Sequence, residues 1–134
     1  MYAALIMIAE ADKAGFWDAY VAKVQAAVDG GVRFGAEATF QVAGPKAELV
    51  VSGITFTIHH DDAAHVVEES ADFAAHYGAD LPDRGDLAQA TTRVTISSTP
   101  DPDMVEFNSY VLLVEIAESV GKTWAFDQNG GAFM

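Results

Sequence analysis

The sequence contains no cysteine. Disulfide frameworks, thiolate zinc sites, iron–sulfur ligation and cysteine nucleophiles are therefore all excluded. Basic residues are also scarce, since seven Lys and Arg stand against twenty Asp and Glu, and they occur singly along the chain. Because scattered cations cannot neutralise a run of phosphates, we expect neither nucleic acid nor an anionic membrane as a partner.

The sequence motifs that would identify an enzyme are missing as well. No Gly-x-Ser-x-Gly turn, His-Glu-x-x-His helix or glycine-rich phosphate loop occurs in the chain. Gly30-Gly31 follows a helical pattern instead of opening one, and Asn129-Gly130-Gly131 precedes only three residues. No motif is therefore diagnostic of a reaction, and no cofactor is expected.

Long apolar runs are absent, and the longest candidate is the first eight residues, which end before Glu10. This run is far shorter than the roughly 20 residues of a membrane-spanning helix, and no basic residue precedes it as in a signal peptide. We interpret it as a central strand with both faces covered. A cytoplasmic location is the matching expectation.

Hydrophobic periodicity predicts the elements of a single domain, residues 1–134, whose composition is half apolar. Turn residues separate the elements, with a hairpin at Gly44-Pro45 and a bulge or bend at Ser52-Gly53. The expected helices start at Asp12, at Asp61 or Asp62, and at Asp101 or Asp103, and they end at Gly30, Gly78 and Val120. The expected strands are 2–9, 36–42, 47–59, 91–98 and 122–127, and 79–90 is a polar connector.

The order of these elements predicts an α+β fold. Strand, helix, strand hairpin, helix and strand form a ferredoxin-like βαββαβ core, to which a C-terminal helix and strand are added. We therefore expect a two-layer sandwich. The centre of the third helix, Tyr110–Val114, is apolar on nearly all sides. Such a helix is usually either wedged in the core or covered by a partner subunit, which leaves a homodimer through the third helix as an open alternative.

Negative charge is concentrated in residues 61–106. Eleven Asp and Glu stand there against Arg84 and Arg93, which leaves nine of the thirteen net negative charges in this stretch. A surplus of one sign attracts cationic partners, although it also keeps a domain dispersed without any partner. The outer face of the second helix, the connector and the segment before the third helix would together form a docking face with an apolar centre inside a polar rim. The predicted interface residues are Glu69, Asp72, Asp80, Leu81, Asp83, Asp86 and Leu87.

A group of histidines and carboxylates provides a weaker metal hypothesis. His59, Asp62 and His65 carry ligand types that suit zinc, manganese or iron. Their spacing matches no zinc signature, and the adjacent His59 and His60 of an extended segment should point to opposite sides. Because a helix N-terminus favours carboxylates without any metal, we interpret the group as a solvated surface and favour no metal site.

Two hypotheses about function follow from these patterns. The first is a non-enzymatic acidic protein-binding module, similar in size and charge to inhibitor and immunity proteins, that engages a basic partner through the 61–106 face. The second is a small dimeric enzyme or ligand-binding domain with a pocket between sheet and helices, and with His59 or His60 at its rim. The aromatic residues that would line this pocket, and that could equally form the core, are Phe16, Trp17, Phe56, Tyr110 and Trp124.

Overall fold

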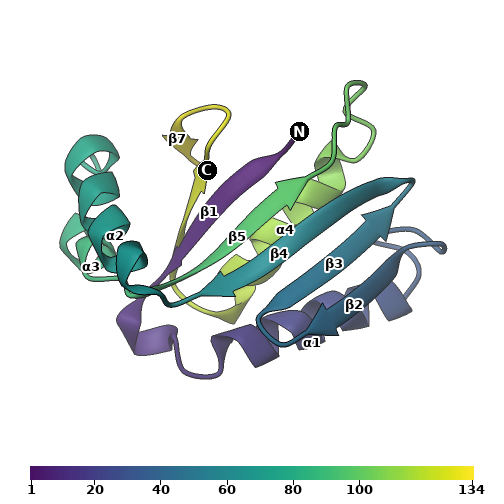
Figure 1. Ribbon diagram of the computed structural model, residues 1–134, viewed down its shortest axis with the longest axis horizontal. Helices are drawn as coiled ribbons and strands as arrows, with labels where there is room; N and C mark the ends of the chain where they lie inside the picture. Colours follow the sequence, from purple (N-terminus) through teal and green to yellow (C-terminus); the bar gives the residue numbers. More distant parts are fainter.

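The computed structural model describes residues 1–134 and has a mixed α+β architecture, as predicted (Figure 1). The strands are β1 (Ala3–Ile8), β2 (Thr39–Ala43), β3 (Lys46–Val51), β4 (Ile54–Asp61), β5 (Thr92–Ser98), β6 (Thr123–Asp127) and β7 (Ala132–Phe133). The helices are α1 (Phe16–Asp29), α2 (Ala64–Tyr77), α3 (Arg84–Ala88) and α4 (Phe107–Val120), and a 3-10 turn, η1 (Glu10–Asp12), lies between β1 and α1.

All seven strands form one antiparallel sheet in the order β2-β3-β4-β5-β1-β6-β7. Strand β1 pairs with both β5 and β6, so it lies inside the sheet, and all but the first of its residues are buried. The prediction that the first apolar run is a central strand covered on both faces is confirmed. Its two faces are covered by different helices.

The main core lies between one face of the sheet and helices α1 and α4, which run behind the sheet in Figure 1. Ile6, Ile58 and Ile96 of three neighbouring strands are fully or almost fully buried there. From the helices, Tyr20 is completely buried, and its hydroxyl donates a hydrogen bond of 3.0 Å to the carbonyl of Leu113. Burial without a charged partner raises the pKa of Tyr20, which keeps it a neutral donor.

Helix α4 is wedged in this core by residues of its own chain. Its buried side chains include Tyr110, Leu113, Val114 and Ile116. Their burial accounts for the nearly all-round apolar centre of the predicted third helix, because α4 packs on both the sheet and α1. The alternative use of this helix in a homodimer remains a prediction.

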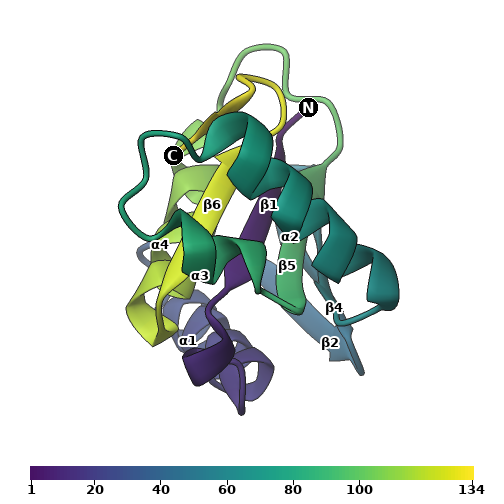
Figure 2. The ribbon, with the colours of Figure 1, turned by 90° about the vertical axis from the view of Figure 1, so that its left-hand side faces the viewer.

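Helices α2 and α3 pack on the opposite face of the sheet, over β1 and β6 (Figure 2). Leu5 and Met7 point to this side because successive residues of a strand face opposite sides. With Trp124 of β6 they form a second apolar cluster, to which α2 contributes Ala74 and α3 contributes Leu87. The second helix therefore does not share a layer with α1 and α4.

The rest of this second face, over β2 to β4 and the part of β5 beyond Arg93, carries no helix and is mostly polar. Thr57 and His59 of β4 lie there, opposite Ser97 and Thr95 of β5. All four side chains are exposed or half-buried. Phe56 and Ile58, which alternate with these residues along β4, are fully buried on the other face.

The predicted helix starts are wrong at Asp12 and Asp61. The Asp12 carboxylate lies in η1 and accepts a 2.8 Å hydrogen bond from the backbone N–H of Lys122, while α1 follows Gly15, whose φ is +70°. Asp61 ends β4, and its carboxylate accepts a 3.0 Å hydrogen bond from the N–H of Ala63 before α2 begins. Both carboxylates therefore accept hydrogen bonds, but neither caps the first turn of an α-helix.

The predicted start of the third helix is also displaced. The Asp101 carboxylate accepts hydrogen bonds from the N–H groups of Val105 and Glu106, at 3.1 and 2.8 Å, and from the Tyr2 hydroxyl at 2.7 Å. These contacts shape a turn in front of α4, which begins at Phe107. The Asp101 carboxylate thus connects this turn to the distant Tyr2 and does not cap α4.

Ser52-Gly53 is a tight turn and not a bulge. Val51 pairs with Ile54 across it, and the φ angles of Ser52 and Gly53 are +52° and +80°. Two central residues with positive φ define the type I′ hairpin turn, whose twist matches that of the flanking strands. The predicted long strand is therefore two strands, β3 and β4.

Candidate docking surface

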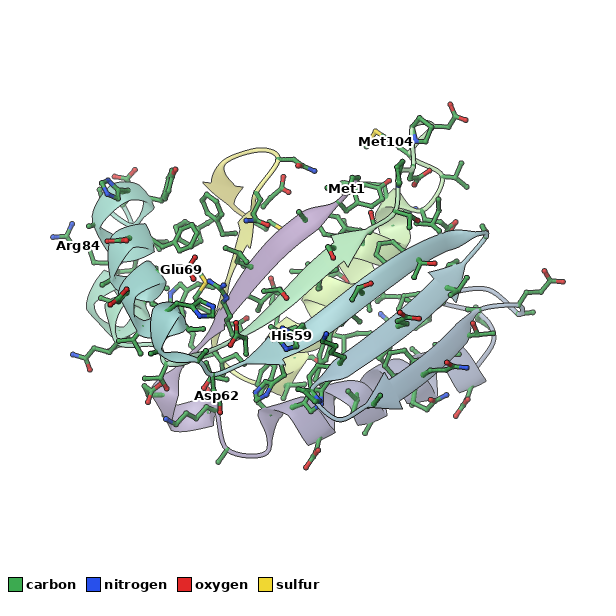
Figure 3. All side chains as sticks on the ribbon, viewed as in Figure 1. Met1, His59, Asp62, Glu69, Arg84 and Met104 are labelled. Carbon is green, nitrogen blue, oxygen red and sulfur yellow. The ribbon has the colours of Figure 1, made fainter.

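The acidic residues of 61–106 lie at two ends of the molecule. Figure 3 shows Glu69 and Arg84 at one end and Met104 at the other. Asp103 and Glu106 belong with Met104 to the segment between β5 and α4, which lies beyond the end of β5, away from α2 and α3 (Figure 1). All seven predicted interface residues belong to the acidic arm, which we define as residues 62–88 with helices α2 and α3.

The exposed charge of the acidic arm is almost entirely negative. Its one Lys or Arg is Arg84, which is exposed. None of the exposed carboxylates of the arm forms an ion pair. These carboxylates belong to Asp62, Glu68, Asp72, Asp80 and Asp86.

The two leucines predicted as the apolar centre of the interface are not available for that role. Leu87 is completely buried in the second cluster, and Leu81 is partly buried against the same cluster. The physical reason is that residues 84–88 of the predicted polar connector form α3, which turns Leu87 towards β1 and β6. The arm surface that remains is polar, with Asp72, Asp80 and Asp86 as its exposed predicted residues.

Asp83 ties the acidic arm to β6 and is not a free surface charge. Its Oδ2 lies 2.6 Å from Nζ of Lys122, and its Oδ1 accepts a 3.1 Å hydrogen bond from Nε1 of Trp124. These contacts, first that of Lys122 and then that of Trp124, lower the pKa of the Asp83 carboxyl. The predicted interface residue is thus a structural anchor.

Glu69 has a similar anchoring role beneath α2. Its Oε2 lies 2.7 Å from NH1 of Arg93, a β5 residue that is only 7 % exposed. His65 of the same helix contacts Oδ2 of Asp61 at 2.9 Å and lies 3.8 Å from Glu69. Burial alone would raise the pKa of Asp61, but the N–H of Ala63, His65 and Arg93 together lower it. This network fixes the start of α2 on the sheet.

The metal candidates do not converge. His59 lies over the sheet and Asp62 lies past the end of β4 (Figure 3), while His65 contacts Asp61. No three His, Asp or Glu side chains gather in a way that could hold a metal ion. His60 points to the other face as predicted, where it stacks on Trp17 at 5.6 Å and where burial lowers its pKa.

A cavity of about 390 Å³ opens between η1, α3 and the start of β6. Asp86, Lys122 and Trp124 line it, together with Glu10 and Asp12, which sequence reasoning did not select. Those two residues are brought there by the fold alone, so no local pattern could have identified them. Of the lining carboxylates only Asp86 lacks a hydrogen-bond partner, because Glu10 accepts from Thr91 and Asp12 accepts from Lys122.

The pocket predicted between the sheet and the helices is filled by side chains. Phe16, Phe56 and Tyr110 are at most 2 % exposed and belong to the main core. Tyr110 also donates a hydrogen bond of 3.1 Å to Asp127 across this interior. The open cavity described above is therefore formed by other residues, of which only Trp124 was among the predicted aromatics.

Comparisons of this chain with protein-family models, with curated proteins and with solved structures find no match. None of its helices combines the length and apolar character needed to cross a bilayer. The function therefore has to be inferred from the side chains of the chain itself.

Proposed function

We propose that the chain is a non-enzymatic acidic binding module that engages a basic protein, in the manner of an inhibitor or an immunity protein. The single observation that carries the proposal is the acidic arm, where five exposed carboxylates face one exposed cation, Arg84. A field of one sign raises the association rate of an oppositely charged partner by roughly ten- to a thousandfold at low salt. The arm is thus suited to rapid capture of a basic protein.

The rigidity of the acidic arm supports the same proposal. The pairs Glu69–Arg93 and Asp83–Lys122 hold it on the sheet at two separate points. A surface that is already ordered loses little conformational freedom on binding, so more of the interaction energy is retained as affinity. The exposed carboxylates of Asp72 and Asp86 are therefore presented from a fixed support.

The cavity beside α3 offers a recess next to this surface. The free carboxylate of Asp86 lies on its wall, and the ring of Trp124 lines it. An arginine or lysine side chain of the partner could pair with Asp86. The ring of Trp124 is only 5 % exposed and already has Nζ of Lys122 over it, 5.4 Å from the ring centroid. The cavity also supports the second hypothesis, a small dimeric enzyme or ligand-binding domain, but none of its residues forms a pair of nucleophile and base.

The finer description of the fold and the location belong to the same proposal. We assign the ferredoxin-like core to β1, α1, β4, β5, α4 and β6, because these four strands are contiguous in the sheet and both helices cover one face. Under this assignment β2–β3 and α2–α3 are insertions, whereas the sequence-based assignment used the hairpin and α2. A cytoplasmic location remains the accompanying expectation.

The proposal is tested by capture of a partner with charge-reversed variants. The arm variant carries Asp72→Lys, Asp80→Lys and Asp86→Lys, and the matched control carries Glu37→Lys, Glu115→Lys and Glu118→Lys, which are exposed residues away from the arm. Both variants change the net charge equally. A basic protein that is retained from cell extract by the native chain and by the control, but not by the arm variant, supports the proposal; equal retention by both variants contradicts it.

A further inference from the structure

The two edges of the sheet differ in how they are protected. Unpaired N–H and C=O groups at a sheet edge recruit other strands, and proteins prevent this with short edge strands, charges, prolines or bulges. The edge strand β7 has only two residues. The edge strand β2 has five, Thr39 to Ala43, without charge, proline or a bulge in its pairing with β3, and it is the outermost strand in Figure 1.

The backbone of β2 offers two residues to a new strand. Ala43 pairs with Lys46 across the two-residue turn Gly44-Pro45. In such a hairpin the residues that flank the turn bond each other, and bonding alternates along the strand. Thr39, Gln41 and Ala43 are therefore directed at β3, while the N–H and C=O groups of Phe40 and Val42 are directed at the open edge.

We propose that β2 pairs antiparallel with β2 of a second copy of this chain, about a two-fold axis at Gln41. Phe40 of one copy then exchanges hydrogen bonds with Val42 of the other, and the two Gln41 residues face each other as a non-hydrogen-bonded pair. Thr39 faces Ala43 of the other copy in the same way. Such an interface is self-complementary, as two-fold symmetry requires.

Charge selects a second copy as the occupant of this edge. Residues 16–51 contain four acidic and three basic residues, whereas the whole chain has a net charge of −13. Two copies therefore approach with the least repulsion through this part of the chain. A basic partner, in contrast, would be drawn to the acidic arm, which packs over β1 and β6 and not over β2.

Side chains on the helix side of β2 add an apolar contact. Phe40 packs on the main core, and Val42 is 46 % exposed although it is aliphatic. Pairing places Val42 of each copy beside Phe40 of the other, which extends the core across the axis. Because five residues per copy bury far less than the roughly 1,200 Å² of a stable interface, the dimer is weak and forms with rising concentration.

The register is tested by cysteine cross-linking, for which the cysteine-free chain is a clean background. Gln41→Cys should form an intermolecular disulfide under mild oxidation, since facing residues bring their Cα atoms to about 4.5 Å. Thr39→Cys and Ala43→Cys are matched controls on the same strand and face. Neither should cross-link alone, but a mixture of the two should. Equal cross-linking of all three single variants would reflect random collision and overturn the proposal.

The pairing itself is tested by sedimentation of the native chain over a range of concentrations. Val42→Pro removes an N–H that points to the open edge, so the β2–β3 ladder is retained while pairing is blocked. We expect a dimer fraction that rises with concentration in the native chain and is at least tenfold smaller in the variant. If Val42→Pro fails to fold, Val42→Lys makes the same test through charge. A native chain that stays monomeric, or a variant that dimerises equally, overturns the proposal.

Salt distinguishes this dimer from binding at the acidic arm. Screening reduces the repulsion between two copies of charge −13, so added salt should strengthen self-association. The same salt should weaken binding of a basic protein to the arm. The two proposals therefore fail independently, and a dimer that salt weakens would contradict the edge pairing proposed here.

Discussion

The buried Arg93 determines which of two adjacent glutamates forms an ion pair. It is 7 % exposed beneath α2, and its guanidinium contacts Glu69. A buried cation is costly unless it is paired, so Glu69 is held to the sheet while its neighbour Glu68 stays free. Local sequence does not distinguish these adjacent glutamates, because the difference between them arises from Arg93, more than twenty residues away.

Substitution of these two glutamates tests the role of Arg93. Glu69→Gln removes the carboxylate that forms an ion pair with the buried guanidinium. It should lower the free energy of unfolding by about 1–3 kcal/mol, since Glu69 is partly exposed and Asp61 still lies near Arg93. Glu68→Gln, the matched control, should change it by less than about 0.5 kcal/mol. Urea denaturation measures both values. Equal effects of the two substitutions would remove the structural role assigned to the pair.

His60 makes stability depend on pH. Burial lowers its pKa from the ordinary value of 6.5, so the unfolded chain binds a proton more readily than the folded chain. Stability from neutral His60 is therefore present above about pH 6.5 and is lost as the pH falls through this value towards the folded pKa. His60→Gln should flatten the decline in unfolding free energy between about pH 7 and pH 5, whereas the exposed control His76→Gln should retain it. An unchanged decline in His60→Gln would contradict this assignment.

At the scale of elements, local sequence patterns predict an element correctly where its own periodicity or turn residues define it. The apolar run 2–9, the Gly44-Pro45 turn and the stop at Gly78 all occur as predicted. The errors fall on Asp12, Asp61 and Asp101, whose carboxylates are claimed by other contacts before a helix can use them. The partners of Asp12 and Asp101, which are Lys122 and Tyr2, lie far along the chain, so a pattern of neighbouring residues does not contain them. Asp61 instead bonds the N–H of the nearby Ala63.

Two glycines of the acidic arm test its element boundaries. At Gly78 an added Cβ would lie 2.7 Å from the carbonyl oxygen of Ala74, whereas at Gly85, inside α3, it would meet no atom within 4 Å. Gly78→Ala should therefore destabilise the chain by about 1–3 kcal/mol, while Gly85→Ala should stabilise it by up to about 1 kcal/mol through helix propensity. Thermal and urea unfolding measure the difference. A stabilising Gly78→Ala would show that α2 ends elsewhere.

At the scale of the whole molecule, order along the chain does not decide which face of a sheet a helix covers. Val66 and Ala74 form a buried stripe on α2, and either face of the sheet could receive such a stripe. Its position over β1 and β6 separates the acidic arm from Asp103 and Glu106 and divides a run of charge that is continuous in sequence. The excess of negative charge in residues 61–106 can be read from the sequence, but the separation of these charges in space cannot.

The central claim is that the acidic arm is the docking surface for a basic partner. Its most direct test is the association rate constant of the captured partner, measured between low and high salt for the native chain and the arm variant Asp72→Lys, Asp80→Lys, Asp86→Lys. We expect the native rate to fall at least about tenfold as salt screens the arm, and the variant to be slow at every salt concentration. A native rate that does not change with salt, or a variant that associates as fast as the native chain, would contradict the account.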